Sequence, residues 1–380
     1  MRKVVIVEYH PFNCKARLGN HQYAALFEKH GFQVLWISHY VSPFHLLKNR
    51  KRNLEKLKLW WRKGMQRTPM LREYCPLTLL PYYKAPILKS FTVLRRSLDF
   101  CIPPVQHVFD RFGFQRPDLV WIGNPVFCEL VPKKVAPRKL FVRIADDNSK
   151  FYDVPESIIE AENRLLKKAD CIFATSTPLF ERLKKTFDGK VRYLPNGVDY
   201  DFFARPRGGI PTEYEGISSK KVIYVGALQR WFDVALVEKL VRDNPQTHFF
   251  LIGELHIDLS GLSRAPNCHV LGPRPYESIP QYLQAADVAI IPFKYTDLIR
   301  SVSPIKLYEY CAAGVPVVSR WWDELAVVNP PARLARTHEE FQSALRQALE
   351  SDQMERDKLQ AFAAANSWGK RFEEIMACLD

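Results

Sequence analysis

Several patterns that mark common protein classes are missing from this sequence. Its eight cysteines are scattered singly with no Cys-x-x-Cys pair, which suits reduced thiols better than a disulfide framework or a zinc site. No apolar run approaches the roughly 20 residues that span a bilayer. The first residues, Met1-Arg2-Lys3, lead straight into the apolar Val4–Val7 without a signal-peptide pattern. We therefore expect a cytoplasmic protein.

Several nucleotide- and nucleic-acid-binding signatures are missing as well. The sequence has no full Gly-x-Gly-x-x-Gly and no P-loop, so a dinucleotide enzyme and a P-loop NTPase have no motif support. The net charge of +14, from 55 basic and 41 acidic residues, predicts attraction to nucleic acid, anionic membranes or phosphorylated substrates. A nucleic-acid-binding protein without enzymatic activity is thus one alternative. However, no RRM, KH, zinc-finger or helix-turn-helix signature accompanies the charge.

Apolar, strand-like runs alternate with helical stretches along most of the chain. The first series ends at Val191–Leu194, and a second runs from Val222–Val225 to Val315–Val318. This alternation is typical of doubly wound α/β domains with parallel strands. Ser278-Ile279-Pro280-Gln281 and Thr337-His338-Glu339-Glu340 each have the form of a capping box, which predicts two helix starts.

The length and the position of the loop-rich stretch predict two domains. A chain of 380 residues is long for a single core. Residues 196–216 are rich in Gly, Pro and charge and interrupt the alternation, so we place the linker there. The predicted domains are 1–205 and 206–365, followed by a helical segment at 366–380. The alternation also breaks inside the first domain, over a basic, aromatic and proline-punctuated insert at about 43–114.

The start of this insert carries a dense basic segment. Between Lys48 and Arg67 the sequence has nine basic residues and one acid, Glu55, for a net charge of +8. Leu54, Leu57 and Trp61 recur at helical spacing, and a basic amphipathic helix with tryptophans suits an anionic membrane surface. A charged helix packed by one side onto the domain is the alternative. The residues that we expect at the membrane are Arg50, Lys51, Arg52, Lys56, Lys58, Trp60 and Trp61.

Distinctive residues follow several predicted strands. In open α/β sheets, ligands bind beyond the carboxyl ends of the strands. Gly226 and Gly253 each follow a strand-like run, where a glycine lets the backbone approach a diphosphate closely; an ordinary turn is the alternative for either one. Asp146 and Asp147 also follow a strand. A carboxylate there can accept a proton from an attacking hydroxyl, or it can cap a helix or a turn.

Residues 304–313 predict a short helix with paired charges. Gly314 suits the left-handed backbone just past a helix end. Lys306 and Glu309 are three residues apart, so they share one face of the helix. A cation for phosphate and a carboxylate for sugar hydroxyls, at a helix start that favours anions, match the needs of a nucleotide-sugar site. A surface helix with a solvated Lys and Glu is the alternative.

These segments closely resemble motifs of two-domain glycosyltransferases of the GT-B fold. The resemblance is to the bacterial branch that includes teichuronic-acid glycosyltransferases and the glucuronosyltransferase of xanthan synthesis. It implies an α/β architecture with two Rossmann-like, doubly wound domains, an interdomain cleft, and a last helix that returns to the first domain. It is strong over roughly the C-terminal half. The segments that carry it, in the family's order, are Leu194–Asp199, Trp231–Asp233, Leu271–Tyr276, Ile290–Phe293 and Ser303–Ser319.

The resemblance also assigns roles to individual residues. Lys306 is expected to stabilise the charge that builds on the leaving diphosphate. Glu309 aligns with the second acid of the family's Glu-x7-Glu pattern, which often holds the ribose hydroxyls. Asp233 belongs to a Trp-x-Asp signature, with a helix cap as the alternative. The donor-binding residues implied by the resemblance are Gly226, Trp231, Asp233, Gly253, Ser303, Lys306, Leu307 and Glu309.

The expected chemistry is an inverting transfer. Asp146 aligns with the catalytic base of the xanthan-type enzyme, whereas Ser301 stands where the family's first acid would be. This departure argues against the retaining arrangement, which is kept as the alternative mechanism. An inactive relative acting as a scaffold is a third reading, and the presence of Lys306, Glu309 and Asp146 at the motif positions argues against it.

The sequence as a whole therefore predicts a glycosyltransferase at the cytoplasmic membrane face. We expect a nucleotide-diphosphate sugar as donor, with UDP favoured, and a lipid-linked or polysaccharide acceptor near His10, His21 and Asp147. No Asp-x-Asp pair follows a strand of the second domain, so we expect a metal-independent reaction with no cofactor and no nucleic acid partner. The protein would be peripheral at the inner face of the plasma membrane.

Overall fold

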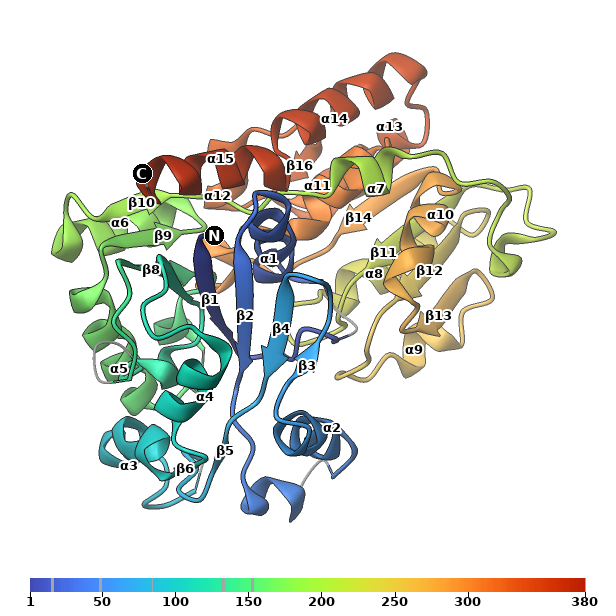
Figure 1. Ribbon diagram of the computed structural model, residues 1–380. Coiled ribbons are helices and arrows are strands. Elements are labelled where there is room, and N and C mark those ends of the chain that lie inside the picture. The colour runs from blue at the N-terminus through green and yellow to red at the C-terminus, as the bar shows by residue number, and fades with distance from the viewer. Residues whose placement is uncertain (15–16, 48–49, 84, 131–133, 152–153, 380) are drawn as a thin grey trace. The chain divides into compact units, whose positions relative to one another are not determined.

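The chain forms two compact units, each with its own sheet and hydrophobic core (Figure 1). Unit 1 comprises Met1–Leu194 and Phe372–Asp380, and unit 2 comprises Pro195–Arg371. The structure is a computed structural model that describes residues 1–14, 17–47, 50–83, 85–130, 134–151 and 154–379.

Unit 1 is built on a mostly parallel sheet. Its central strands are continuous apolar runs, and Val4, Val5, Ile6 and Val7 of β1 are fully buried, as expected where helices cover both faces of a parallel sheet. Only β3 pairs antiparallel among the described strands of this sheet. Its eight strands, in spatial order, are β10 (Val191–Tyr193), β9 (Cys171–Ala174), β8 (Lys139–Ile144), β7 (Leu119–Ile122), β1 (Lys3–Glu8), β2 (Gln33–Ser38), β4 (Leu71–Tyr74) and β3 (Met65–Gln66).

The helices of unit 1 follow the strands along the chain. Phe372 of the last helix packs on Phe27 of α1, with the ring centroids 4.8 Å apart. A short antiparallel pair, β5 (Leu77–Thr78) and β6 (Cys101–Ile102), lies within the insert. The helices are α1 (Gly19–Lys29), α2 (Arg50–Trp61), α3 (Phe91–Arg96), α4 (Val105–Phe112), α5 (Glu156–Lys168), α6 (Thr177–Phe187) and α15 (Trp368–Leu379), the last of which begins in unit 2.

Part of the insert forms strands of the main sheet. The sequence predicts a break in the alternation over 43–114, whereas β4 pairs in parallel with β2. The strand carries a fully buried acid, Glu73. Arg67 forms an ion pair with the Glu73 carboxylate at 2.6 Å, and the backbone N–H of Phe12 donates to it at 2.9 Å. These partners offset the cost of burying the charge.

Unit 2 has an all-parallel sheet among its described strands. The strand order reverses between β11 and β14, which lie side by side although β12 and β13 come between them in sequence. The α/β prediction with doubly wound domains is thus confirmed. In spatial order the six strands are β13 (Cys268–Gly272), β12 (His248–Ile252), β11 (Lys221–Val225), β14 (Val288–Ile291), β15 (Val317–Arg320) and β16 (Arg333–Ala335).

The helices of unit 2 begin with different capping arrangements. Thr337 caps α13 by accepting from the Glu340 N–H at 3.1 Å, as predicted. The side chain of Ser278 makes no such bond and donates to the Pro275 carbonyl at 2.8 Å, so that capping box is wrong. The helices are α7 (Tyr200–Ala204), α8 (Val234–Asp243), α9 (Ser260–Ser263), α10 (Ile279–Gln284), α11 (Ile305–Ala312), α12 (Asp323–Val328), α13 (His338–Ala348) and α14 (Gln353–Ala365).

Candidate functional site

The clearest site of unit 2 lies where its strand order reverses. Gly226 directly follows β11, Pro292 directly follows β14, and α11 begins at Ile305 on the way to β15. In parallel sheets of this kind, the connections that follow two neighbouring strands run to opposite sides at this point, and they leave a crevice for ligands at the carboxyl ends of the strands. Gly314 ends α11 in the left-handed region, with φ +69°, as the sequence predicts.

Lys306 lies against Gly226 at this point. A Cβ at Gly226 would stand 2.9 Å from Cε and 3.3 Å from Nζ of Lys306. The ammonium also lies 4.6 Å from the ring centroid of Phe293 and 5.6 Å from that of Tyr224. Lys306 is half-buried, and burial lowers its pKa to about 8, although Glu309 acts in the opposite direction. The side chain is therefore a crowded cation, which a bound anion would stabilise.

Glu309 is the second charged group on this face of α11. It is half-buried, and burial raises its pKa to about 7, opposed by Lys306 and by a hydrogen bond from Tyr276. The Tyr276 ring stacks on Phe202 with centroids 5.1 Å apart. A carboxylate held in this way can accept hydrogen bonds from vicinal hydroxyls. The structure thus brings Lys306, Glu309 and Gly226 together.

Gly226 and Gly253 form a close backbone contact. A Cβ at Gly253 would stand 1.9 Å from the carbonyl oxygen of Gly226. Their φ angles are +150° and +153°, which disfavour any side chain. Both positions therefore require glycine for packing as well as for any approach to a diphosphate.

Residues around α11 hold it in place. The Asn196 amide donates to the Ser303 carbonyl at 2.6 Å, and the Ser303 hydroxyl accepts from the Asn196 N–H at 3.2 Å. The Tyr310 hydroxyl accepts from the Val225 N–H at 2.8 Å and lies 3.1 Å from the Val225 carbonyl. Leu307 is fully buried in the core. Ser303 and Leu307, predicted as donor-binding residues, thus have contacts that position the helix.

Trp231 and Asp233 make hydrogen bonds within unit 2. The Asp233 carboxylate accepts from the Leu236 N–H at 3.1 Å and caps α8, and it lies 3.0 Å from Nε2 of His338. The Trp231 carbonyl accepts from the Lys294 N–H at 2.8 Å. The helix-cap alternative for Asp233 is therefore the one that the geometry matches.

Unit 1 has its own reversal of strand order, between β1 and β7. Glu8 ends β1 and is buried, and the Asn20 amide donates to its carboxylate. Burial raises the pKa of Glu8, opposed by hydrogen bonds from Asn20 and Tyr9 and by the charge of Arg143. A Cβ at Gly123 would stand 2.6 Å from Nδ2 of Asn20. Sequence reasoning missed Glu8, although an acid directly after an apolar strand was the available signal.

Asp146 and Asp147 differ in their surroundings. Asp146 is exposed at the edge of a cavity of about 110 Å³ that Arg143 and Glu162 also line. Desolvation of its carboxyl group by the surrounding protein raises the pKa, and the charge of Arg143 acts in the opposite direction. Asp147 is buried; it accepts from the Ser149 N–H at 3.1 Å and forms an ion pair with Arg182 at 3.2 Å. Asp146 is thus the more available base, whereas Asp147 is a capping residue.

The two histidines predicted near the acceptor have largely structural contacts. His21 is buried, its Nδ1 accepts from the Leu18 N–H at 3.3 Å, and burial lowers its pKa to about 4. The His10 carbonyl accepts from the indole N–H of Trp36 at 3.1 Å, and its ring meets that of Tyr9 edge-on. A proton-transfer role for His21 has no support in this geometry.

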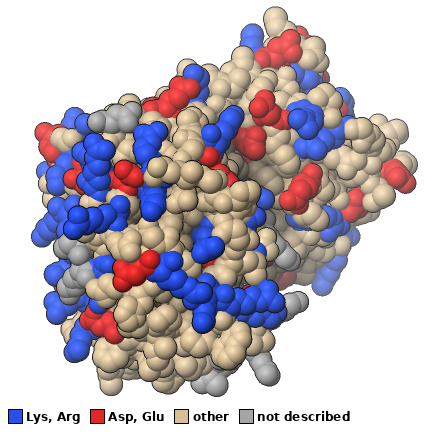
Figure 2. All heavy atoms as spheres, in the orientation of Figure 1, with Lys and Arg blue, Asp and Glu red and all other residues tan. Residues whose placement is uncertain are grey.

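Helix α2 presents only part of the predicted membrane set. Lys56 is buried and donates to the His39 carbonyl at 2.9 Å, so its expected lipid contact is corrected. Lys58 is exposed, and Trp61 is 76% exposed. Figure 2 shows Lys and Arg side chains gathered over the part of unit 1 that contains α2. The side chains of Arg50, Lys51 and Arg52 lie outside the described residues.

The described part of the chain has neither a cluster of metal ligands nor a helix that could span a membrane. Across the residues that the structure describes, no three His, Cys, Asp or Glu side chains cluster as a metal site would require. Every helix in the described part of the chain is too short or too polar to cross a bilayer.

Comparisons with known proteins agree with this architecture. Residues 219–351 match the family described as Glycosyl transferases group 1. The putative teichuronic acid biosynthesis glycosyltransferase TuaH of Bacillus subtilis is 29% identical over 172 residues, which cover 42% of this chain and 43% of that protein. The alignment thus spans less than half of the curated relative.

Solved structures extend the likeness to the whole chain. Sucrose-phosphate synthase from Thermosynechococcus elongatus aligns with a TM-score of 0.70 at 15% identity, over 99% of this chain and 98% of that chain. A trehalose-6-phosphate structure from E. coli, bound with UDP-2-fluoro glucose, aligns with a TM-score of 0.69 at 12% identity, over 99% of this chain and 98% of that chain. Anabaena HepE in complex with UDP and glucose aligns with a TM-score of 0.68 at 14% identity, over 100% of this chain and 99% of that chain.

Together these findings give the fold of the chain and the family that part of unit 2 matches. The chain has the GT-B fold, and residues 219–351 of unit 2 match the family of glycosyl transferases of group 1. The protein resembles glycosyltransferases of the teichuronic-acid type.

Proposed function

We propose that this protein transfers a sugar from a nucleotide-diphosphate sugar to a lipid-linked or polysaccharide acceptor. The observation that carries the proposal is the Lys306 ammonium, set against Gly226 at the reversal point of the unit 2 sheet. As the donor reacts, negative charge builds on its diphosphate. A cation already in place stabilises that charge more in the transition state than in the ground state.

The donor is held by groups with distinct tasks. Lys306 binds the diphosphate, and Glu309 accepts hydrogen bonds from sugar hydroxyls. The glycines at 226 and 253 keep the crevice clear of side chains. We favour UDP as the nucleotide, a choice supported by the UDP compounds named for the E. coli and Anabaena structures.

The acceptor is activated by Asp146 in an inverting reaction. Its carboxylate takes the proton of the acceptor hydroxyl as the oxygen attacks the sugar carbon. Exposure of Asp146 beside a small polar cavity supports this role. No metal ion or cofactor takes part in the proposed reaction, because Lys306 supplies the electrostatic stabilisation.

The reaction takes place at the inner face of the cytoplasmic membrane. Support comes from the insert, which holds seven of the fourteen exposed large hydrophobic side chains found among the described residues. Exposed hydrophobic residues that are scattered singly are normal in proteins, but their concentration in a segment rich in basic residues favours binding to a lipid surface. The seven are Phe44, Leu54, Trp61, Leu79, Ile87, Phe100 and Ile102.

A thermal-shift screen tests the donor. Sugars of UDP, GDP, ADP and TDP are compared at equal concentration, because a ligand at 100 times its Kd adds about 2.7 kcal/mol of stability. We expect a UDP-sugar to raise the Tm most and to release UDP on addition of an acceptor glycan. The proposal fails if none of the four raises the Tm and none is turned over.

A further inference from the structure

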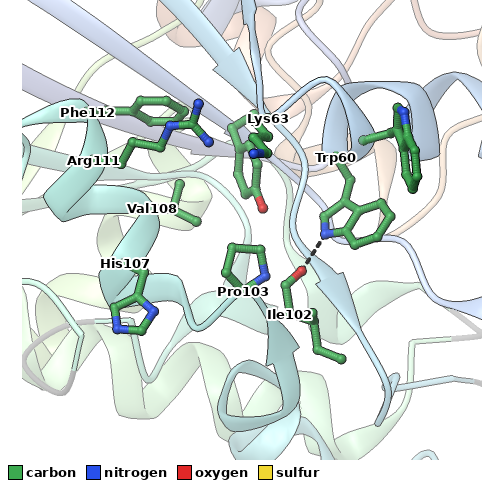
Figure 3. A pocket seen from close by; sticks show the side chains of 10 residues that line it. Trp60, Lys63, Ile102, Pro103, His107, Val108, Arg111 and Phe112 are labelled. Carbon is green, nitrogen blue, oxygen red and sulfur yellow. Dashed lines mark hydrogen bonds between the residues drawn. The ribbon is translucent and has the colours of Figure 1, made fainter.

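A large apolar pocket in unit 1 lies apart from the residues assigned to the reaction (Figure 3). Its volume is about 630 Å³, within the range of about 300–1,000 Å³ that is typical of small-molecule sites. It lies between the end of α2 and the β6–α4 segment, where the Trp60 indole donates to the Ile102 carbonyl. The lining residues are Trp60, Trp61, Lys63, Tyr74, Ile102, Pro103, His107, Val108, Arg111 and Phe112.

One polar group that lines the pocket has no hydrogen-bond partner among the described residues. The Tyr74 side chain is 3% exposed, and its hydroxyl makes no hydrogen bond to the described residues. A buried donor left unsatisfied costs about 1–3 kcal/mol, so the hydroxyl points to a ligand with an acceptor atom. Burial raises the pKa of Tyr74, and Arg111 acts in the opposite direction. The phenol therefore keeps its proton and remains a donor.

The charges of the pocket wall have a single sign. Lys63 and Arg111 are exposed cations, His107 is also exposed, and the described lining contains no Asp or Glu. In Figure 3 the side chains of Lys63 and Arg111 lie toward the same end of the pocket, near Phe112. Such a wall is complementary to an anionic group at one end and to hydrocarbon along the rest.

We propose that this pocket binds the hydrocarbon chain of an anionic, phosphate-bearing lipid taken from the bilayer. The chain lies along Trp60, Ile102 and Val108, the phosphate meets Lys63 and Arg111, and the Tyr74 hydroxyl donates to a head-group oxygen. The lipid source rests on the proposed function at the membrane face, since 76% of Trp61 is exposed at the same opening. The binding chemistry itself does not depend on sugar transfer.

Calorimetry with dodecyl phosphate, kept below its micelle concentration, tests the site on the full chain. Inorganic phosphate and neutral dodecyl maltoside are the comparison ligands. We expect dodecyl phosphate to bind at least tenfold more tightly than either, because only it offers both the chain and the anion. Equal binding of inorganic phosphate would mean a surface anion site and would overturn the lipid assignment.

Tyr74→Phe is the sharpest variant, because it removes only the unpartnered hydroxyl. A hydrogen bond to a charged group is worth about tenfold or more in affinity, so the Kd for dodecyl phosphate should rise by about that factor. The Tm should stay the same or rise, since no protein hydrogen bond is lost. An unchanged Kd would remove Tyr74 from the site.

Two further variants separate the pocket from simple adsorption. Lys63→Gln with Arg111→Gln should weaken dodecyl phosphate binding, whereas the matched pair Lys89→Gln with Arg95→Gln, exposed elsewhere in the insert, should not. Ile102→Trp should block the chain without changing the charge. The proposal is wrong if the two double variants bind dodecyl phosphate with the same affinity. It is also wrong if Ile102→Trp binds dodecyl phosphate as tightly as the parent does.

The same proteins distinguish this proposal from the proposed function. Thermal shifts with UDP-sugars should be unchanged in the Tyr74, Lys63/Arg111 and Ile102 variants, because the donor residues lie in unit 2. If the parent binds dodecyl phosphate but no UDP-sugar, the proposed transferase function is refuted and the lipid pocket is still supported. The reverse result would refute the pocket alone.

Discussion

The affinity for UDP should fall as the pH rises, because Lys306 loses its proton near pH 8. Burial lowers its pKa to about 8 from the usual value of 10.5. Below pH 8 the site offers a cation to the diphosphate. Above it, binding must first protonate the lysine, at about 1.36 kcal/mol for each pH unit. Between pH 7 and pH 9 the Kd should therefore rise about tenfold.

Calorimetry with UDP at intervals of half a pH unit gives this profile. The terminal phosphate of the nucleotide ionises near pH 6, so it stays fully charged over the range. Lys306→Ala is the control, because it has no titrating amine at this position. Its affinity should be low and nearly independent of pH. A parent profile as flat as that of Lys306→Ala would refute the reasoning, since the cation would then not touch the diphosphate.

Three other predictions address the site. Gly226→Ala should weaken UDP binding by about tenfold or more, measured by calorimetry, because its Cβ would meet Lys306 at 2.9 Å and a φ of +150° strains alanine. Asp146→Asn should lower the transfer rate constant by about 10²–10⁴-fold with UDP binding unchanged. The control is Asp188→Asn at an exposed position, and an equal fall in its rate constant would contradict a specific role for Asp146 as the base. EDTA should leave the transfer rate unchanged, and rescue by Mg²⁺ would contradict metal independence.

The elements with strong local signals were predictable. Helix α11 was predicted at 304–313 and is observed at Ile305–Ala312. Gly314 ends it in the left-handed conformation because no other residue adopts that backbone as easily. The strand after it was predicted at 315–318 and forms two residues later, at Val317–Arg320, because an apolar run does not mark where pairing begins.

Residues whose environment is set by distant partners were not predictable. Leu71–Tyr74 shows no clean alternation, and only Arg67 and the Phe12 N–H explain why Glu73 is buried in β4. Lys56 belongs to a run of basic residues that predicts a solvated face, yet its ammonium reaches the His39 carbonyl inside unit 1. Long-range contacts of this kind leave no periodic trace in the sequence.

The candidate site likewise contains residues that the sequence predicts and residues that it does not. Lys306 and Glu309 were found because three-residue spacing in a helix places them on one face. Tyr276 ends one of the segments that carry the family resemblance. Its hydrogen bond to Glu309, which lowers the pKa of that carboxyl, depends on folding across the sheet and leaves no signal in the sequence. Asp233 fits the helix-cap alternative through its contacts with Leu236 and His338, and its role in donor binding stays a prediction.

The most direct test of the account is the affinity of UDP for Lys306→Ala at pH 7. Calorimetry should show binding weakened by about 1.5–3 kcal/mol, the scale of a hydrogen bond to a charged group. The matched control is Lys220→Ala, an exposed lysine before β11 that pairs with Asp287 at 3.0 Å, and it should bind UDP as the parent does. If Lys306→Ala also binds UDP as tightly as the parent, the central claim is contradicted.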